Sequence, residues 1–226
     1  MKQPKRFLIA LAAALLLPAG APADEPHSHP GGAEELGQVD FPISCNAAAQ
    51  KEFHRAVAML HSFWYEAAEK SFRAVADADP GCAMAYWGVA MSLYHPIWPD
   101  RAPVDKGRAA VEQAKAIGAK TDRERAYIEA IGQYYADEGK PDYTRRAQTY
   151  EKAMERVYRA FPQDREAAAF YAVALLWTLS YAPADQTNPR KAAAVLDKIA
   201  DEMPKHPGVL HYYIHAYDSP QLAPLA

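Results

Sequence analysis

A single 34-residue pattern, spanning residues 49–82, constrains the fold of this chain more than any other feature. In a helix–turn–helix unit of this length, small residues stand where the two helices approach closely, and aromatic residues and a proline stand where the unit packs and ends. Counted from Ala49 as the first position, positions 8, 17, 20, 24 and 32 are Ala56, Tyr65, Ala68, Phe72 and Pro80. One such unit cannot bury its apolar face alone, so the pattern predicts a stack of helix pairs.

The pattern starts again at Ala83, which places Tyr86 at position 4 and Ala90 at position 8 of a second unit. It weakens where a proline-rich segment, residues 95–99, interrupts that unit, because proline lacks the backbone donor that a helix needs. Later caps and prolines still mark helix boundaries. We therefore expect four helix pairs, followed by one unpaired helix that begins at Pro207–Gly208.

The repeating unit resembles the tetratricopeptide repeat. In residues 60–69, 86–94 and 211–216 the chain is also similar to a group of secreted bacterial tetratricopeptide repeat proteins. The resemblance implies an all-α, right-handed solenoid of stacked antiparallel helix pairs that binds other proteins, and it implies no reaction and no catalytic residues. Because that group is usually longer, and because Ser219–Pro220 resembles the start of another helix, we expect an N-terminal portion of a longer solenoid.

Three segments are predicted along the chain. Residues 1–23 have the basic start, the short apolar run and the small-residue cleavage site of a signal peptide. Residues 24–40 are rich in Pro, Gly, Glu and Ala and are predicted to be a disordered linker. Residues 41–226 are predicted to form the repeat domain, with its first unit at about 49–82.

The signal peptide and the net charge together limit the partners. Its apolar run, residues 7–17, is shorter than the roughly 20 residues of a membrane-spanning helix, so we expect cleavage and no membrane span; an uncleaved anchor is the alternative. The protein should then be exported, to a periplasm or outside the cell. A net charge of -3, without a long basic run, argues against nucleic acid as a partner.

The two cysteines, Cys45 and Cys82, are 37 residues apart, which is close to one repeat length. Each precedes the first helix of a predicted unit, and stacking brings such helix starts together. An oxidising compartment would let them form a disulfide. Two small buried residues are the alternative, and the spacing excludes a C-x-x-C redox pair.

Stacked repeats line a concave groove with their first helices, which makes that surface the predicted binding site for a protein or peptide. Positions 2, 5, 9, 12 and 13 of each unit tend to face it. The residues that we predict to contact a partner are Phe53, His61, Met84, Trp87, Met91, Tyr94 and His95. Aromatic and methionine side chains suit an adaptable peptide-binding face. The alternative is that they are core residues, since apolar side chains at helical spacing usually are.

The histidines suggest an alternative function, a metal-binding or metal-dependent protein that holds Zn or Cu. His61 and His95 are 34 residues apart and therefore equivalent in the repeat, while His211 and His215 lie on one helix face. A structural zinc site normally needs four ligands, which two such pairs would have to supply together. The phosphate-loop, dinucleotide and nucleophile-elbow motifs are absent from the sequence, so we expect neither catalysis nor a required cofactor.

Overall fold

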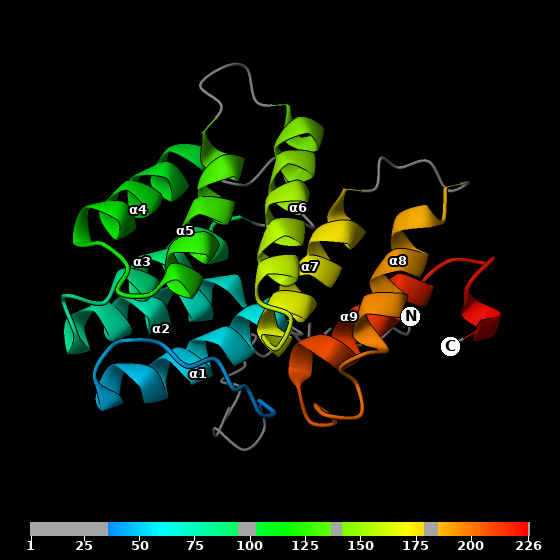
Figure 1. The fold of residues 1–226 in the computed structure, drawn as a ribbon, viewed down its shortest axis with the longest axis horizontal. Coiled ribbons are helices and arrows are strands. Elements are labelled where there is room, and N and C mark those ends of the chain that lie inside the picture. The colour runs from blue at the N-terminus through cyan, green and yellow to red at the C-terminus, as the bar shows by residue number, and fades with distance from the viewer. Residues whose placement is uncertain (1–35, 95–102, 137–141, 179–184, 226) are drawn as a thin grey trace, which may run out of the picture. The chain divides into compact units, whose positions relative to one another are not determined.

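The computed structural model describes residues 36–94, 103–136, 142–178 and 185–225, which all belong to one unit, residues 31–226. Their regular structure is entirely helical (Figure 1). The elements are α1 (Ala47–His61), α2 (Tyr65–Ala78), α3 (Ala83–Ser92), α4 (Val104–Ile117), α5 (Asp122–Tyr135), α6 (Tyr143–Ala160), α7 (Arg165–Trp177), α8 (Thr187–Leu196), α9 (Pro207–Tyr217) and the short 3₁₀ helix η2 (Ala223–Leu225). The predicted all-α class is confirmed, and none of these helices is long and apolar enough to cross a membrane.

Successive helices pack as neighbours. α1 packs on α2, α3 on α4, α5 on α6 and α7 on α8, and each pair also contacts the next (Figure 1). Local capping explains several helix starts, since the side chains of Asn46, Thr121, Asp142 and Asp164 each accept a backbone N–H of the helix that follows. α1 begins close to the start of the first predicted unit, and α9 begins at Pro207, where the sequence predicts a helix start.

Cys45 and Cys82 form a disulfide, with their Cα atoms 5.4 Å apart, which confirms that prediction. The bond joins the residues that immediately precede α1 and α3. It therefore fixes the starts of the first helices of two adjacent pairs.

The predicted signal peptide, residues 1–23, lies outside the described residues, as does most of the predicted linker. The last part of that linker, residues 36–40, is packed against the helices, which corrects the expectation of disorder there. The Leu36 side chain is buried, and the backbone N–H of Gln38 donates to the carbonyl of Lys205 over 2.9 Å. Burial of an apolar side chain and a satisfied backbone donor hold this segment in place.

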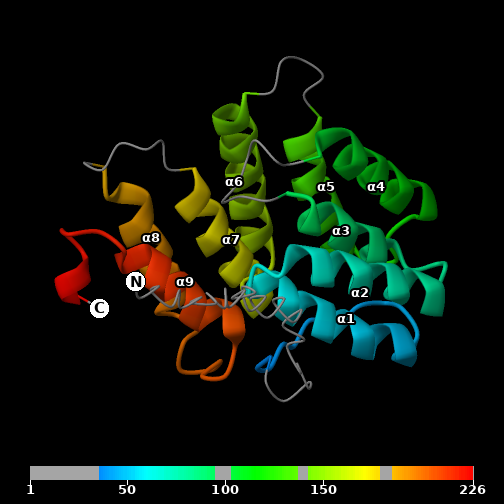
Figure 2. The same ribbon diagram turned by 180° about the vertical axis from the view of Figure 1, so that it is seen from behind.

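Phe41 forms the centre of an aromatic core made by several first helices. Its ring lies 5.2 Å from that of Phe53 in α1, 5.4 Å from Trp87 in α3, 4.9 Å from Tyr127 in α5 and 6.3 Å from Phe170 in α7. α1 also contacts α9, although about 150 residues separate the two in the sequence (Figure 2). The inner faces of these helices are thus covered by one another and by the segment that carries Phe41.

This packing corrects the predicted partner-binding groove. None of the described side chains that we expected to face it is more than 3% exposed; they are Phe53, His61, Met84, Trp87, Met91 and Tyr94. They are core residues, which is the alternative that the helical spacing allowed. His95 lies outside the described residues.

Candidate functional site

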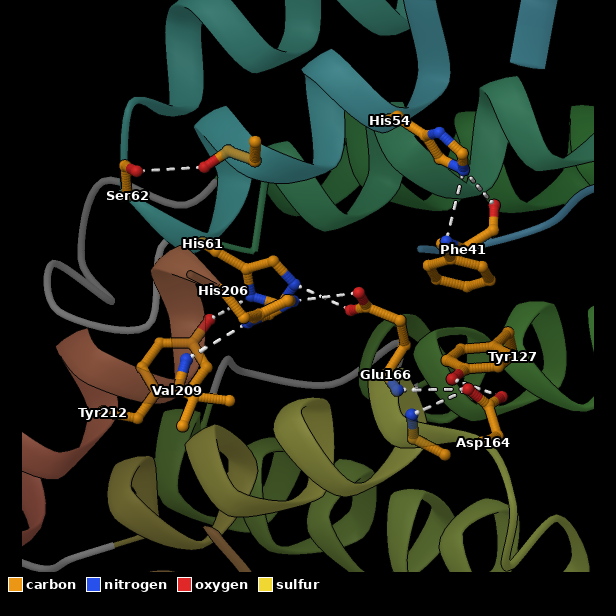
Figure 3. A network of polar contacts seen from close by, with 12 residues as sticks. Phe41, His54, His61, Ser62, Tyr127, Asp164, Glu166, His206, Val209 and Tyr212 are labelled. Atoms are coloured by element: carbon orange, nitrogen blue, oxygen red, sulfur yellow. Dashed lines mark hydrogen bonds and ion pairs between the residues drawn. The ribbon is translucent and has the colours of Figure 1, made fainter. Parts of the chain in front are cut away.

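A buried cluster of four polar side chains joins three helices that are far apart in the sequence (Figure 3). His61 is the last residue of α1, Glu166 lies in the first turn of α7, His206 is the N-cap of α9, and Tyr212 lies within α9. None of the four is more than 1% exposed. We call this group the buried histidine–glutamate cluster.

Each carboxylate oxygen of Glu166 meets one imidazole. Oε2 lies 2.9 Å from Nε2 of His61, and Oε1 lies 2.9 Å from Nε2 of His206. Nδ1 of His61 lies 2.7 Å from the hydroxyl oxygen of Tyr212. Nδ1 of His206 accepts the backbone N–H of Val209 over 3.2 Å, which caps the start of α9.

These contacts determine where the protons lie. Because His206 uses the lone pair of Nδ1 as an acceptor, its ring proton is on Nε2 and is donated to Glu166. An ionised carboxylate can only accept, so Nε2 of His61 also donates to Glu166. Nδ1 of a neutral His61 then accepts the hydroxyl proton of Tyr212. Every ring nitrogen and both carboxylate oxygens are satisfied in this arrangement.

The electrostatics agree with this arrangement. Burial disfavours the cation and lowers the pKa of His61, outweighing the attraction of Glu166. Burial alone would raise the pKa of Glu166, but the attraction of His61 and His206 once they are protonated, together with the hydrogen bonds that both donate, outweighs it and lowers that pKa to about 2. The N-termini of α7 and α9 also meet here, and their partial positive charge stabilises an anion.

A close approach of α9 to His61 depends on Gly208. A Cβ atom at this position would lie 2.6 Å from Nδ1 of His61, well inside van der Waals contact. Only glycine therefore allows the first turn of α9 to pack directly on this imidazole.

His61, Glu166 and His206 form the one group of three metal-type ligands that the described residues bring together, with donor atoms within 4.8 Å of one another. Two histidines and a carboxylate are a known ligand set for metals. Coordination through Nε2 of His206, however, requires a lone pair on that nitrogen, whereas its capping bond to Val209 places the ring proton there. The hydrogen bonding is thus better explained by a structural role, in which the cluster links α1, α7 and α9, than by a metal centre.

A second cluster, which we call the aromatic–histidine cluster, adjoins the first and consists of Phe63, Trp177, His211 and His215. The Phe63 ring lies 4.2 Å from the His211 ring and 5.7 Å from both the His215 and Trp177 rings. The rings of Trp177 and His215 are 5.4 Å apart. Both histidines are only half-buried, so this cluster reaches the surface.

Phe63 adopts a left-handed backbone conformation, with φ of 60°. It follows the C-cap of α1, and the N–H groups of Phe63 and Trp64 bond back to Leu60 and Met59, as in a Schellman motif. Glycine usually occupies this position because a side chain is strained there, at a cost of roughly 1–2 kcal/mol. The strained backbone holds the aromatic ring against both histidines of the cluster.

The two histidines of α9 are oriented by defined hydrogen bonds. Nδ1 of His211 lies 2.8 Å from the carbonyl oxygen of His61 and must donate to it, since a carbonyl only accepts. This leaves a lone pair on Nε2 of His211, which lies 3.2 Å from Nε2 of His215. Burial, followed by the charge of His211, lowers the pKa of His215, while Asp218 acts in the opposite direction.

The structure therefore regroups the histidines that the sequence singled out. His211 and His215 lie together as expected. The ring of His61 instead contacts Glu166 and Tyr212. The predicted metal site that combines His61 with His211 and His215 is therefore wrong. Only the backbone carbonyl of His61 meets that pair.

Sequence reasoning missed Glu166, His206 and Tyr212. The sequence does mark both helix starts, since Asp164 precedes α7 and Pro207–Gly208 opens α9. Glu166 and His206 could therefore be placed beside these starts from the sequence alone. Nothing in the sequence indicates that these two starts meet the end of α1.

Comparisons of the chain with protein-family models, with curated proteins and with solved structures gave no match. The functional argument therefore rests on the geometry of these residues.

Proposed function

We propose that this chain is an exported, tetratricopeptide-like helical-repeat protein that binds a protein partner on the exposed face of α9. The observation that carries the proposal is the exposure of two large apolar side chains one helical turn apart, Leu210 at 57% and Ile214 at 68%. Only two other large apolar side chains of the described residues are comparably exposed, Trp64 and Leu225. Two of these four exposed apolar side chains therefore lie on one face of one helix.

The packing of the other helices indicates what would cover this face. In each pair from α1 to α8, the first helix buries an apolar face against the second helix of its pair. Apolar residues spaced by four, as Leu210 and Ile214 are, suit an amphipathic helix lying alongside. We therefore expect the partner to contribute such a helix, a contact of the kind that stacks the pairs of this protein.

Binding is favoured over catalysis by the burial of the polar groups. The buried histidine–glutamate cluster holds the acid–base side chains with the most defined geometry, and none of them is more than 1% exposed. A substrate cannot reach a general base that it cannot contact. The disulfide between Cys45 and Cys82 supports export, since such bonds persist in oxidising compartments.

A matched pair of double variants tests the proposal. Leu210→Glu/Ile214→Glu places charge on the exposed face of α9, whereas Ala109→Glu/Gln113→Glu places the same charge on exposed positions of α4. Partners captured from the native periplasm by the parent protein are identified and purified, and their affinities for all three proteins are measured. Removal of an interface anchor typically costs about 2 kcal/mol or more, so the α9 variant should bind at least about 30-fold more weakly.

The α4 variant should bind as the parent does, and circular dichroism should show unchanged helicity for both, since all four side chains are exposed. Equal affinity of the parent and the α9 variant would rule out α9 as the docking surface.

A further inference from the structure

We infer that His211 and His215 form a binding site for a divalent transition-metal ion, with Cu²⁺ as the preferred ion. The site is distinct from the buried histidine–glutamate cluster and does not depend on the proposed partner. Four features carry the inference: the spacing of the two nitrogens, the fixed proton of His211, the ends of three helices, and the aromatic walls.

The distance between the two Nε2 atoms suits a shared metal ion. Nitrogen–metal bonds to histidine are about 2.0–2.1 Å long, so two nitrogens 3.2 Å apart would subtend an angle of roughly 100–106° at the metal. This value lies between the 90° of square-planar and the 109° of tetrahedral geometry. The two rings therefore need little movement to hold one ion.

The hydrogen bond of His211 prepares it as a ligand. Its Nδ1–H donates to the backbone carbonyl of His61, which fixes the tautomer and aims the lone pair of Nε2 at His215. A backbone carbonyl is one of the common acceptors for the second ring nitrogen of a metal-bound histidine. His215 is half-exposed, so its ring proton can move to Nδ1, where water can accept it, and leave a second lone pair.

The surrounding backbone favours a cation. α1 ends at His61, α7 ends at Trp177, and His215 lies in the last turn of α9. Each helix C-terminus carries a partial negative charge of roughly half an electron. Three such ends near one pair of imidazoles stabilise a positive ion, whereas the N-termini of α7 and α9 stabilise the Glu166 carboxylate at the other cluster.

The aromatic side chains restrict the histidines before any ion binds. Phe63 packs on both imidazoles from a strained backbone, and Trp177 packs on His215. Supported ligands lose less entropy on binding.

The ligand set defines the chemistry. Two imidazoles suit Cu²⁺, Ni²⁺ and Zn²⁺, and a site without special geometric selection should follow the order Cu²⁺ above Ni²⁺ and Cu²⁺ above Zn²⁺. With two nitrogens from the protein, the remaining positions of the ion are open to water or to a small ligand. We therefore expect exchangeable binding rather than the closed site of a structural zinc.

The test is calorimetric titration of the full-length, untagged protein with CuCl₂, together with electron paramagnetic resonance of the Cu²⁺ complex. The parent for all variants carries His27→Ala and His29→Ala, which removes two further histidines near the N-terminus. We expect one Cu²⁺ ion per chain, with a spectrum showing coupling to imidazole nitrogen.

Three single variants identify the site. Loss of an outer partner alone typically weakens metal binding about 10–100-fold, so His211→Ala and His215→Ala should each weaken it at least about tenfold. Glu166→Gln removes a carboxylate ligand from the buried histidine–glutamate cluster and should leave the affinity unchanged. Thermal unfolding without metal establishes that each variant is folded.

The inference is overturned if the parent binds no stoichiometric Cu²⁺, or if His211→Ala and His215→Ala bind it as the parent does. It is also overturned if Glu166→Gln alone abolishes binding, because the ion would then lie in the buried histidine–glutamate cluster. His215→Ala is the more secure of the two histidine variants, since this side chain is half-exposed and makes no backbone hydrogen bond among the described contacts.

Discussion

Replacement of Glu166 by glutamine should reduce stability in a pH-dependent way. The side chain is completely buried, and its pKa is lowered from 4.5 to about 2 by His61 and His206. Glutamine has nearly the same shape and resembles the protonated acid. It therefore removes the charge while it keeps the packing.

The magnitude follows from the linkage between protonation and folding. A depression of the Glu166 pKa from 4.5 to about 2 corresponds to at most about 3 kcal/mol in favour of the folded carboxylate, and the part that comes from the N–H hydrogen bonds of the two imidazoles is present at neutral pH. This contribution is present above the unfolded pKa of 4.5, and it is lost as the pH falls toward 2. Glu166→Gln should thus cost about 1–3 kcal/mol at pH 7, or roughly 2–12 °C in Tm.

The hydrogen-bond geometry explains how the variant can still fold. His206 must continue to donate from Nε2, so the glutamine oxygen should face His206 and its NH₂ group should face His61. His61 can then accept at Nε2 and donate from Nδ1 to the Tyr212 oxygen. In the variant, only His61 changes its tautomer, and no hydrogen-bond donor faces another donor.

Urea unfolding of the parent and Glu166→Gln at several pH values between 7 and 3 measures this effect. Glu112→Gln, on an exposed side chain of α4, is the control and should stay within about 0.5 kcal/mol of the parent. The parent should also lose stability as the pH falls below 6.5, because the lowered pKa of His61 means that the unfolded chain takes up a proton first. A cost for Glu166→Gln that is below about 1 kcal/mol at pH 7 would refute the reasoning.

Two further changes test the packing around these clusters. Gly208→Ala places a Cβ atom 2.6 Å from Nδ1 of His61, so overpacking should cost about 1–3 kcal/mol in urea unfolding; a change within 0.5 kcal/mol, on the order of a surface substitution, would show that α9 can shift freely. Cys45→Ser/Cys82→Ser opens a loop of 37 residues and should cost about 3–4 kcal/mol in the chain-entropy model, with unchanged helicity at low temperature; a parent protein that titrates two free thiols when denatured without reductant would contradict the disulfide.

The sequence alone determined the local architecture of the first two helix pairs. The small residues Ala56 and Ala68 and the aromatic Phe72 are all completely buried, as the repeat positions predict. Gly88 also meets Phe72 so closely that a Cβ atom would lie 2.1 Å from its ring. These features are local because helix propensity, caps and close helix crossings act within about 40 residues.

The disulfide was predictable for a related reason. Cys45 and Cys82 are 37 residues apart, which is close to the predicted repeat length, so the packing of two adjacent helix pairs is sufficient to bring them together. Their pairing depends on one interface between neighbouring helix pairs rather than on the path of the whole chain.

Only the tertiary structure decided whether the inner faces are open or packed. Periodicity shows that Trp87, Met91 and Tyr94 share an apolar face. Such a face is equally consistent with an open binding groove and with a buried core. The insertion of Phe41 and the contact between α1 and α9 make it a core. Both contacts depend on how all of the helix pairs pack together, which no single pair encodes.

The two histidine clusters also differ in whether the sequence alone could predict them. The spacing of four between His211 and His215 is a property of one helix, so the sequence was enough to place them together. The pairing of His61 with Glu166 spans 105 residues, and that of His61 with Tyr212 spans 151. Such contacts arise only after several helix interfaces have each set an angle, because a small change at any one of them would separate a hydrogen bond that tolerates only a few tenths of an ångström.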